Sequence, residues 1–328
     1  MMTIYLVLFS LSFTISLIIT FIIKQRFSQQ LLDIPNERSS HTQPTPRGGG
    51  LGFIIAFAIT SSVYIITNSS LEEFIFLWLV LVSLSIIGII DDNQDVPAAI
   101  RYLVQLLAAS IAIFHFHPFI FPGLDNLGIF GNIIAIALTV IGFTAMINFY
   151  NFMDGLDGIV GGCSAVQLGF LAIYFNQPLL WLLVAAIMGF LWWNWSPAKI
   201  FMGDAGSTVL GATVAIALLN NHTDMIHAWS AVAIIFPLIA DAIYTLVRRI
   251  LKGENIFQAH RSHIYQRLQQ SGWSHSQVAS TYICLNIVIG VSVYYFDFIG
   301  FLISLGISTL LIVLGEIYLA TYQKSTES

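Results

Sequence analysis

The chain has 328 residues, of which 57% are hydrophobic and only 9% are charged, and its mean hydropathy is +0.84. A soluble domain carries about 25% charged residues, and a soluble core could not hide this much apolar surface. The composition therefore excludes a soluble globular protein and, with only 12 lysine and arginine residues, argues against nucleic-acid binding.

The apolar segments predict an all-α, polytopic integral membrane protein with about eleven transmembrane helices in a single domain, residues 1–328. A spanning helix needs about 20 residues, and about 17 are tolerated. The expected spans are residues 2–23, 49–67, 73–90, 98–116, 129–150, 159–175, 179–195, 206–220, 227–247, 278–296 and 298–320. The fourth contains Arg101 and Gln105, and the eighth is short and rich in glycine.

The basic residues support this count. All 12 fall in or beside the connections that follow odd-numbered spans, or in the tail after the last one. Positively charged residues stay on the cytoplasmic side. We therefore expect the N-terminus outside, the C-terminus in the cytoplasm, and the active site on the cytoplasmic face. The cytoplasmic loops are then about residues 24–48, 91–97, 151–158, 196–205 and 248–277.

The first of these loops places Arg38, His41 and Arg47 ahead of a run of three glycines. A glycine-rich segment that opens a helix can present backbone N–H groups to phosphate. A glycine run before a span also occurs where helices pack closely. Both interpretations stand on the sequence alone.

The second loop carries Asp91, Asp92 and Asp95. Two adjacent carboxylates repel each other, and a divalent cation or a proton relieves that repulsion. Mg²⁺ is commonly held by one or two carboxylates together with substrate phosphates. The alternative is an ordinary acidic pair at a helix end.

The third loop contains the last three of four polar residues that recur every three positions: Asn148, Asn151, Asp154 and Asp157. In a helix this spacing predicts one slowly turning face. Such polar residues at the edge of a bilayer are costly unless they have a function. A polar helix cap is the simpler alternative, but a cap needs only one such side chain.

The fourth loop ends in the segment GDAGS, residues 203–207, just before the eighth span. Asp204, flanked by glycines and followed by hydroxyl groups, suits a site for a metal and pyrophosphate. The alternative role of an aspartate at this position is an N-cap.

The last loop is the longest and contains His260, Arg261 and His263. The two histidines are three residues apart, which places them on one face if the segment is helical. Zinc would need three or four nitrogen or sulfur ligands, and no cysteine lies on this side. Phosphate contact or acid–base work is therefore favoured over zinc binding, with solvated loop histidines as the alternative.

Together these motifs resemble the polyprenyl-phosphate N-acetylhexosamine-1-phosphate transferases of the glycosyltransferase 4 family, relatives of phospho-N-acetylmuramoyl-pentapeptide transferase. The sequence has DDxxD at 91–95, NxxNxxDGxDG at 148–158, GDAGS at 203–207 and a histidine-containing last loop, in the family's order. The first and last loops resemble the branch that initiates O-antigen and enterobacterial common antigen. The peptidoglycan branch usually has lysine at the position of Asp95 and three consecutive histidines in the last loop, so this departure argues against a muramoyl-pentapeptide donor.

The resemblance implies a bacterial inner-membrane enzyme that transfers an N-acetylhexosamine-1-phosphate from a UDP-sugar to undecaprenyl phosphate and releases UMP. It implies the initiating step of a cell-envelope polysaccharide such as O-antigen. The donor would be UDP-GlcNAc or a 6-deoxy relative such as UDP-FucNAc or UDP-QuiNAc. The implied cofactor is Mg²⁺, with Mn²⁺ as a substitute, and the implied partners are both substrates and the lipid bilayer, with a homodimer left open.

The resemblance also assigns roles. Asp204 and Asp92 are expected to hold the metal. The expected catalytic residues are Asp91, Asp92, Asp154, Asp157 and His263. Substrate contacts are expected from Asn148, Asn151, Arg47, His41, His260, Arg261 and Asp95.

Two other function classes fit the composition. An intramembrane, Mg-dependent prenyltransferase would show two aspartate-rich motifs in related helical repeats and would need neither GDAGS nor the last-loop histidines. A lipid or ion transporter would place polar residues at mid-membrane and show internal repeats. The sequence leaves open the sugar, the polysaccharide pathway, the oligomeric state, and whether transfer is direct or passes through a covalent intermediate.

Overall fold

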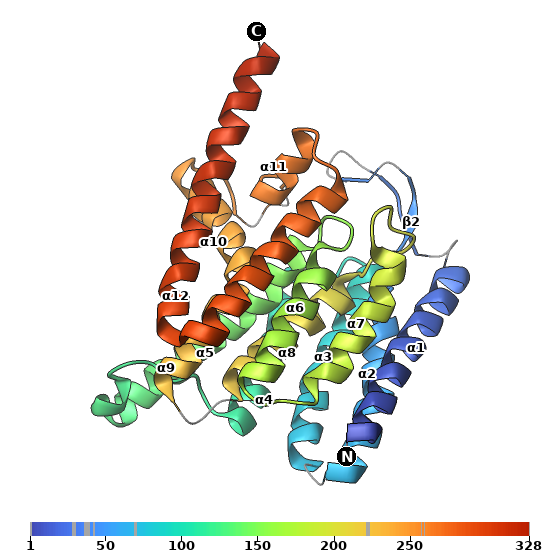
Figure 1. Ribbon diagram of the computed structural model, residues 1–328, viewed down its shortest axis with the longest axis vertical. Coiled ribbons are helices and arrows are strands. Elements are labelled where there is room, and N and C mark those ends of the chain that lie inside the picture. Colours follow the sequence, from blue (N-terminus) through green and yellow to red (C-terminus); the bar gives the residue numbers. More distant parts are fainter. Residues whose placement is uncertain are drawn as a thin grey trace.

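The computed structural model describes residues 2–27, 31–35, 40–41, 43–68, 71–220, 224–256, 258 and 260–327, and Arg38 lies outside them. The described chain is almost entirely helical, as expected (Figure 1). One departure is a short antiparallel pair in the first loop, β1 (Leu32–Asp33) and β2 (Thr45–Pro46), with Leu32 opposite Pro46.

The helices follow the expected spans closely. They are α1 (Met2–Phe27), α2 (Gly50–Asn68), α3 (Leu71–Asn93), α4 (Ala98–Phe116), α5 (Ile129–Met153), α6 (Ile159–Tyr174), α7 (Leu180–Asn194), α8 (Asp204–Leu219), α9 (Met225–Val232), α10 (Phe236–Leu251), α11 (Ile264–Gln270) and α12 (His275–Glu327), with short 3₁₀ turns η1 (Leu124–Leu127) and η2 (Ala233–Ile235).

Three expected spans differ in detail from single separate helices. The ninth is built from α9, η2 and α10, and the change of helix type falls just before Pro237, which has no N–H to donate. The tenth and eleventh are the two parts of α12, which is interrupted at Asp297, where φ is 47° and ψ is −118°. Short α11 in the last loop was not expected.

Within the described ranges, six helices are long and apolar enough to cross a membrane, and four more apolar helices are shorter. Large apolar side chains such as those of Ile66, Phe114 and Phe130 are exposed on the outer faces of the bundle. A surface of this kind is stable in lipid and not in water. The protein is therefore an all-α polytopic membrane protein.

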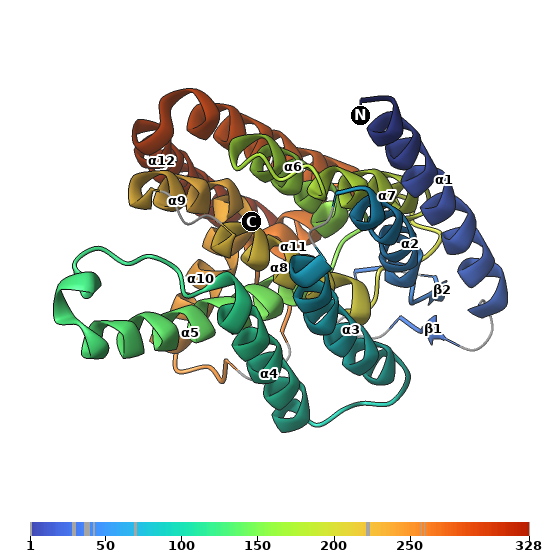
Figure 2. The same cartoon turned by 90° about the horizontal axis from the view of Figure 1, so that it is seen from below.

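Helix α8 lies in the middle of the bundle, and every residue from Ala205 to Leu219 is buried (Figure 2). Small residues allow this packing. A side chain at Gly88 of α3 would collide with the backbone of Ala205, and one at Gly50 of α2 would collide with Gly206. Close approach through small residues is the usual way in which membrane helices pack. Here it brings the start of α2 and the end of α3 against the start of α8.

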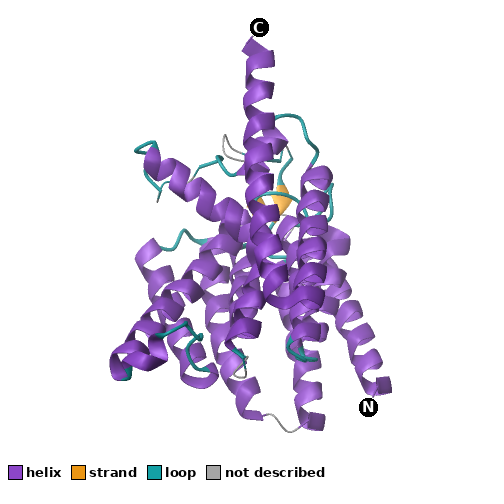
Figure 3. Cartoon of the chain, turned by 60° about the vertical axis from the view of Figure 1, so that its left-hand side comes forward, coloured by secondary structure: helices purple, strands orange, loops and turns teal. Residues whose placement is uncertain are grey.

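The loops that carry the sequence motifs gather at one end of the bundle. β2, α11 and the C-terminus lie at this end, which we call the loop end, and the N-terminus lies at the opposite end (Figure 1). The last part of α12 extends beyond the other helices (Figure 3). This arrangement agrees with termini on opposite sides of a membrane.

Candidate active site

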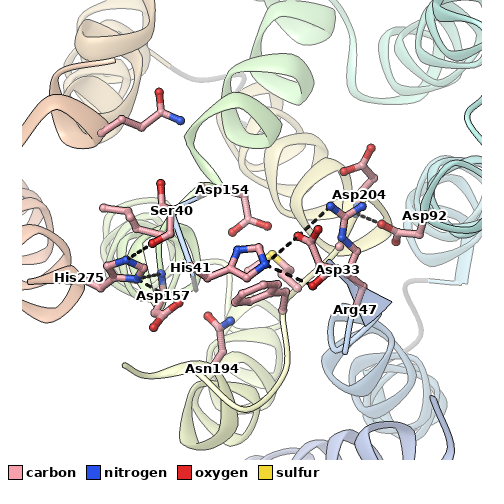
Figure 4. Close-up of a pocket in the computed structure, with 16 residues that line it drawn as sticks. Asp33, Ser40, His41, Arg47, Asp92, Asp154, Asp157, Asn194, Asp204 and His275 are labelled. Atoms are coloured by element: carbon pink, nitrogen blue, oxygen red, sulfur yellow. Dashed lines mark hydrogen bonds and ion pairs between the residues drawn. The ribbon is translucent and has the colours of Figure 1, made fainter. Parts of the chain in front are cut away.

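A cavity of about 270 Å³ opens at the loop end (Figure 4). Seven segments contribute to its wall: the first loop, the end of α3, the turn after α5, the end of α7, the segment that leads into α8, α11 and the first residue of α12. The N-terminus of the buried helix α8 therefore faces a space that loops from both ends of the chain enclose.

The start of α8 is held by a carboxylate from another helix. Asp92 Oδ1 accepts the backbone N–H of Asp204 at 3.0 Å. Gly203 has φ of +79°, and a side chain there would collide with the carboxylate of Asp92. Glycine is therefore required at position 203, because the backbone there has a positive φ and the carboxylate of Asp92 approaches it closely.

The side chain of Asp204 is held from two sides. Asn151 donates from Nδ2 to Asp204 Oδ1 at 2.9 Å and to Ser207 Oγ at 3.1 Å. The Nη1 atom of Arg101 lies 2.7 Å from Asp91 Oδ2 and 3.8 Å from Asp204 Oδ2. Asp91 is therefore already paired with an arginine, whereas Asp204 is only loosely neutralised.

Asp154 faces the same cavity from the turn after α5. Burial, and then the nearby charges of Asp204 and Asp92, raise the pKa of Asp154 to about 8. The hydrogen bonds of the described residues include none to its carboxylate. Asp92, Asp154 and Asp204 thus place three carboxylates at one cavity, and the raised pKa of Asp154 indicates that the cavity holds too little positive charge to balance them.

Asp157 lies three residues further on and is held very differently. Its Oδ1 is 3.2 Å from Nδ1 of His275, and its Oδ2 accepts the N–H of Ala198 at 3.1 Å. Nε2 of His275 in turn lies 3.0 Å from the carbonyl oxygen of Ser40. Burial opposes ionisation of Asp157, but the hydrogen bond and charge of His275 and the Ala198 N–H outweigh it and lower its pKa.

The first loop places one basic side chain and one imidazole at the cavity. Arg47 Nη2 is 2.8 Å from Asp33 Oδ2, and Nε2 of His41 is 3.3 Å from the backbone oxygen of Asp33. Half-exposed Arg47 also raises the local positive potential near Asp92 and Asp204. His41 and Arg47 thus both line the cavity, and their contact with an anionic substrate stays a prediction.

The glycine run after Arg47 has a packing role. The N–H groups of Gly49 and Gly50 donate to the carbonyl oxygens of Phe201 and Met202 at 2.9 and 2.8 Å. These two N–H groups are therefore not free to bind phosphate. Of the two interpretations of this run, close packing is the one that the structure supports.

The spacing of three does not produce one helical face. Helix α5 ends at Met153, so only Asn148 and Asn151 are helical, and Asp154 and Asp157 lie in the turn that follows. Asn148 exchanges hydrogen bonds with the amide of Gln105, donating to its Oε1 at 2.8 Å. The four residues therefore point to different places, and the prediction of a shared helical face is wrong.

The last-loop histidines do not share a helical face either. Residues 260–263 are not helical, and α11 begins only at Ile264. His263 is the N-cap of α11 and is 3% exposed, and its ring lies 5.0 Å from that of His260. Burial, and then the charges of His263 and Arg249, lower the pKa of His260 to about 4. Arg261 donates to Ser40 Oγ at 3.2 Å.

The structure thus brings together part of the predicted site. Six predicted residues line the cavity: His41, Arg47, Asp92, Asp154, Asp157 and Asp204. A small adjoining cavity, which shares Asp204, is lined by Asp91, Asn148 and Asn151. The lining residues of the main cavity do not include His260, Arg261, His263 or the exposed Asp95.

Sequence reasoning missed several lining residues, among them Asp33, Ser40, Asn194, Gln266 and His275. Asp33 and Ser40 belong to the same loop as Arg47, so that loop offered a signal. His275 follows Ser274, whose N–H is capped by Gln277 Oε1 at 2.8 Å, a pattern that marks a helix start. No local signal distinguishes Asn194.

The donor set fits Mg²⁺ better than a metal held by protein alone. In the described part of the chain, no group of three histidine, cysteine, aspartate or glutamate side chains is placed to hold a metal ion by itself. The cavity instead offers carboxylate oxygens of Asp92, Asp154 and Asp204 on one side and open space on the other. Mg²⁺ typically takes one or two carboxylates and completes its shell with water and substrate phosphates.

Comparison with known proteins identifies the family to which the chain belongs. Residues 74–222 match the model for glycosyl transferase family 4. A probable undecaprenyl-phosphate N-acetylglucosaminyl 1-phosphate transferase of Bacillus subtilis (strain 168) is 30% identical over 335 residues, which cover 95% of this chain and 90% of that protein. The undecaprenyl-phosphate alpha-N-acetylglucosaminyl 1-phosphate transferase of Yersinia pestis is 31% identical over 270 residues, covering 75% and 72%.

A phospho-N-acetylmuramoyl-pentapeptide-transferase of Staphylococcus carnosus (strain TM300) is 27% identical over 316 residues, covering 87% of this chain and 97% of that protein. The similarity therefore extends along nearly the whole chain. The chain belongs to glycosyl transferase family 4, and it is a transferase enzyme.

Proposed function

We propose that this protein transfers an N-acetylhexosamine-1-phosphate from a UDP-sugar to undecaprenyl phosphate and releases UMP. A phosphate oxygen of the acceptor forms a bond to the phosphorus that carries the sugar, and the bond from that phosphorus to UMP breaks. The observation that carries the proposal is the cavity at the start of α8, where the carboxylates of Asp92, Asp154 and Asp204 face Arg47 and His41. Two relatives have names that state this reaction class.

The reaction joins two anionic substrates, so its main physical requirement is neutralisation of phosphate charge. Arg47 supplies a fixed positive charge at the cavity, and His41 supplies a hydrogen-bonding ring beside it. Arg101, on the other side of Asp204, holds Asp91 in place and lies next to the small adjoining cavity. A lipid-linked phosphate at the level of the bilayer surface would approach from the ends of the helices.

The residues that would hold Mg²⁺ are Asp204 and Asp92, with Asp154 beside them. When bound, the ion would neutralise phosphate oxygens and polarise the phosphorus centre. Asn151 fixes the Asp204 carboxylate, and the N–H of Asp204 fixes that of Asp92. Two of the carboxylates thus keep their positions despite their mutual repulsion, which is the preorganisation that phosphoryl transfer requires.

We further propose that eleven spans place the loop end in the cytoplasm of a bacterial inner membrane, where the nucleotide sugar is available. All 12 basic residues lie in or beside the connections assigned to that side. Cysteines introduced at Asn176 and Ser262 should react with an impermeant thiol reagent from opposite sides of the membrane. Reaction from the same side would contradict this topology.

The donor is proposed to be UDP-GlcNAc or a UDP-6-deoxy-hexosamine, and the product an initiating lipid of a cell-envelope polysaccharide such as O-antigen. Asp95 and the HRSH sequence at 260–263 depart from the pattern typical of the muramoyl-pentapeptide branch. The test is UMP release by the purified full-length protein with undecaprenyl phosphate, Mg²⁺ and a panel of UDP-sugars. UMP release only with UDP-MurNAc-pentapeptide would reassign the donor, and no release with any donor would reject the proposal.

A further inference from the structure

Asp241 is a buried acidic residue that does not line the active-site cavity. It lies in α10, is 2% exposed, and accepts four hydrogen bonds. The donors are the backbone N–H groups of Ile264 at 2.9 Å and Tyr265 at 3.1 Å, the Tyr282 hydroxyl at 2.6 Å and the Thr245 hydroxyl at 3.1 Å. A buried carboxylate is costly unless such donors surround it. The burial of Asp241 among four donors therefore calls for a structural or functional explanation.

Two of these donors are the first two N–H groups of α11. This helix has only seven residues, Ile264–Gln270, and an isolated helix of that length is not stable in water. Its first N–H groups have no partner within the helix. Asp241 supplies that partner from α10, so the position of α11 depends on this carboxylate.

Helix α11 reaches the active site through its second and third residues. The hydroxyl of Tyr265 donates to the backbone oxygen of Phe152 at 3.0 Å, and a side chain at Gly155 would collide with that hydroxyl. Gln266 lines the cavity next to Asp154 and Gly155. Its Oε1 accepts the N–H of His263 at 3.4 Å, which directs the amide nitrogen away from that bond. The turn that carries Asp154 is therefore packed directly against α11.

We propose that Asp241 is a positioning residue for the transfer reaction. Through the N–H groups of Ile264 and Tyr265 it fixes α11, and α11 holds Gln266 at the substrate cavity and supports the turn of Asp154. The kinetic part of this inference rests on the proposed function, whereas the anchoring of α11 does not. Asp241 is not among the residues that line the active-site cavity.

A matched pair of variants at one position isolates the anchor. Ile264→Pro deletes the N–H that Asp241 accepts, and proline is well tolerated at the first position of a helix. The preceding residue, His263, already has the extended conformation that proline favours, with φ of −62° and ψ of 149°. Ile264→Ala removes a comparable part of the buried side chain but keeps the N–H, so it is the control.

Two measurements compare this pair in the full-length protein. Hydrogen exchange of residues 265–270, measured without substrate, should be faster in Ile264→Pro than in Ile264→Ala. The kcat/KM for the UDP-sugar should be about tenfold lower in Ile264→Pro than in the control, with the KM for undecaprenyl phosphate unchanged. Equal exchange and equal kinetics in the two variants would overturn the proposal.

Asp241→Asn extends the test to the carboxylate. Both oxygens of Asp241 accept hydrogen bonds, and the amide nitrogen that replaces one of them cannot accept, so part of the anchor is lost. We expect kcat/KM to fall about 100-fold, as for a small displacement of catalytic groups. In a Gln266→Ala background the same change should cost clearly less than about 100-fold, because the part of its effect that acts through Gln266 is already lost. Additive effects, with a matching fall in melting temperature, would show that Asp241 only supports the fold and would overturn the proposal.

The exchange and kinetic measurements distinguish failure of this inference from failure of the proposed function. If Asp241→Asn does not fold, the pair at Ile264 still decides between anchoring and a general structural role. If the wild-type protein releases no UMP, the proposed function fails, and the kinetic part of this inference fails with it. The exchange comparison would then still accept or reject the anchoring of α11 by Asp241.

Discussion

Two sides of one cavity hold their carboxylates in opposite ways. On the acidic side, Asp92, Asp154 and Asp204 face one another, and the pKa of Asp154 is raised to about 8. On the paired side, Asp157 is bound by His275 and by the N–H of Ala198, and its pKa is lowered. Asp154 and Asp157 are only three residues apart, so sequence position does not explain the difference.

The contrast separates a binding role from a structural one. Asp157 has internal partners that join the turn after α5 to the start of α12 and, through His275, to Ser40. The acidic side has too few internal partners for its charge, and such destabilised groups are typical of functional sites. We therefore expect substitutions on the acidic side to cost activity without stability, and substitutions on the paired side to cost stability first.

The largest effect should come from Asp204→Asn. The amide keeps the shape of the side chain but removes the charge that would hold the metal, so the rate of UMP release should fall at least about 1,000-fold. The melting temperature in detergent should be unchanged or higher, because repulsion with Asp92 is relieved. A rate within tenfold of wild type would reduce Asp204 to a helix-start residue.

Asp154→Asn should reduce the rate by about 100-fold and increase stability. The pKa of Asp154 is about 8 in the folded protein against an ordinary value of 3.8, so the folded state binds the extra proton between these values. Stability of the metal-free wild type should thus fall as pH rises from about 4 to about 8, and the variant should lose part of this slope. Melting temperatures over this pH range check the prediction; an identical slope in the variant would contradict it.

His275→Ala should show the opposite balance. Removing one partner of a largely buried pair leaves the carboxylate of Asp157 without its imidazole, which we expect to cost about 2 kcal/mol of stability. The rate per folded molecule should fall less than tenfold. Because the pKa of Asp157 is lowered, the stability that this carboxylate contributes is present above the ordinary aspartate pKa and is lost as pH falls. An unchanged melting temperature with a large loss of rate would place His275 among the catalytic residues.

The smallest effect distinguishes two roles of His263. If its main role is to cap α11, His263→Ala should cost about 1 kcal/mol, and His263→Asn, a good N-cap, should restore most of it. The rate should change by less than about threefold in the asparagine variant. A fall of about 100-fold in both variants, with unchanged melting temperatures, would support the catalytic role that the sequence favours.

The sequence predicts the helices well because each is a long apolar run, and it predicts six of the residues that line the cavity because they belong to compact motifs. It does not reveal that α5 ends before Asp154, since a spacing of three does not mark where a helix stops. It also misses contacts between distant segments. The partners of Asp157 and of α11, His275 and Asp241, lie far from them in the chain, and only the packing of α10 and α12 brings them close.

The central claim is that the acidic side of the cavity is a cation site completed by substrate phosphate. The most direct test is the proton count that accompanies Mg²⁺ binding at about pH 7 with UDP-GlcNAc present, from calorimetry in buffers of different ionisation enthalpy. With a pKa of about 8, Asp154 is mostly protonated before binding, so wild type should release about one proton more per Mg²⁺ than Asp154→Asn. Equal proton release by both proteins, or equally tight Mg²⁺ binding by Asp204→Asn, would contradict the account.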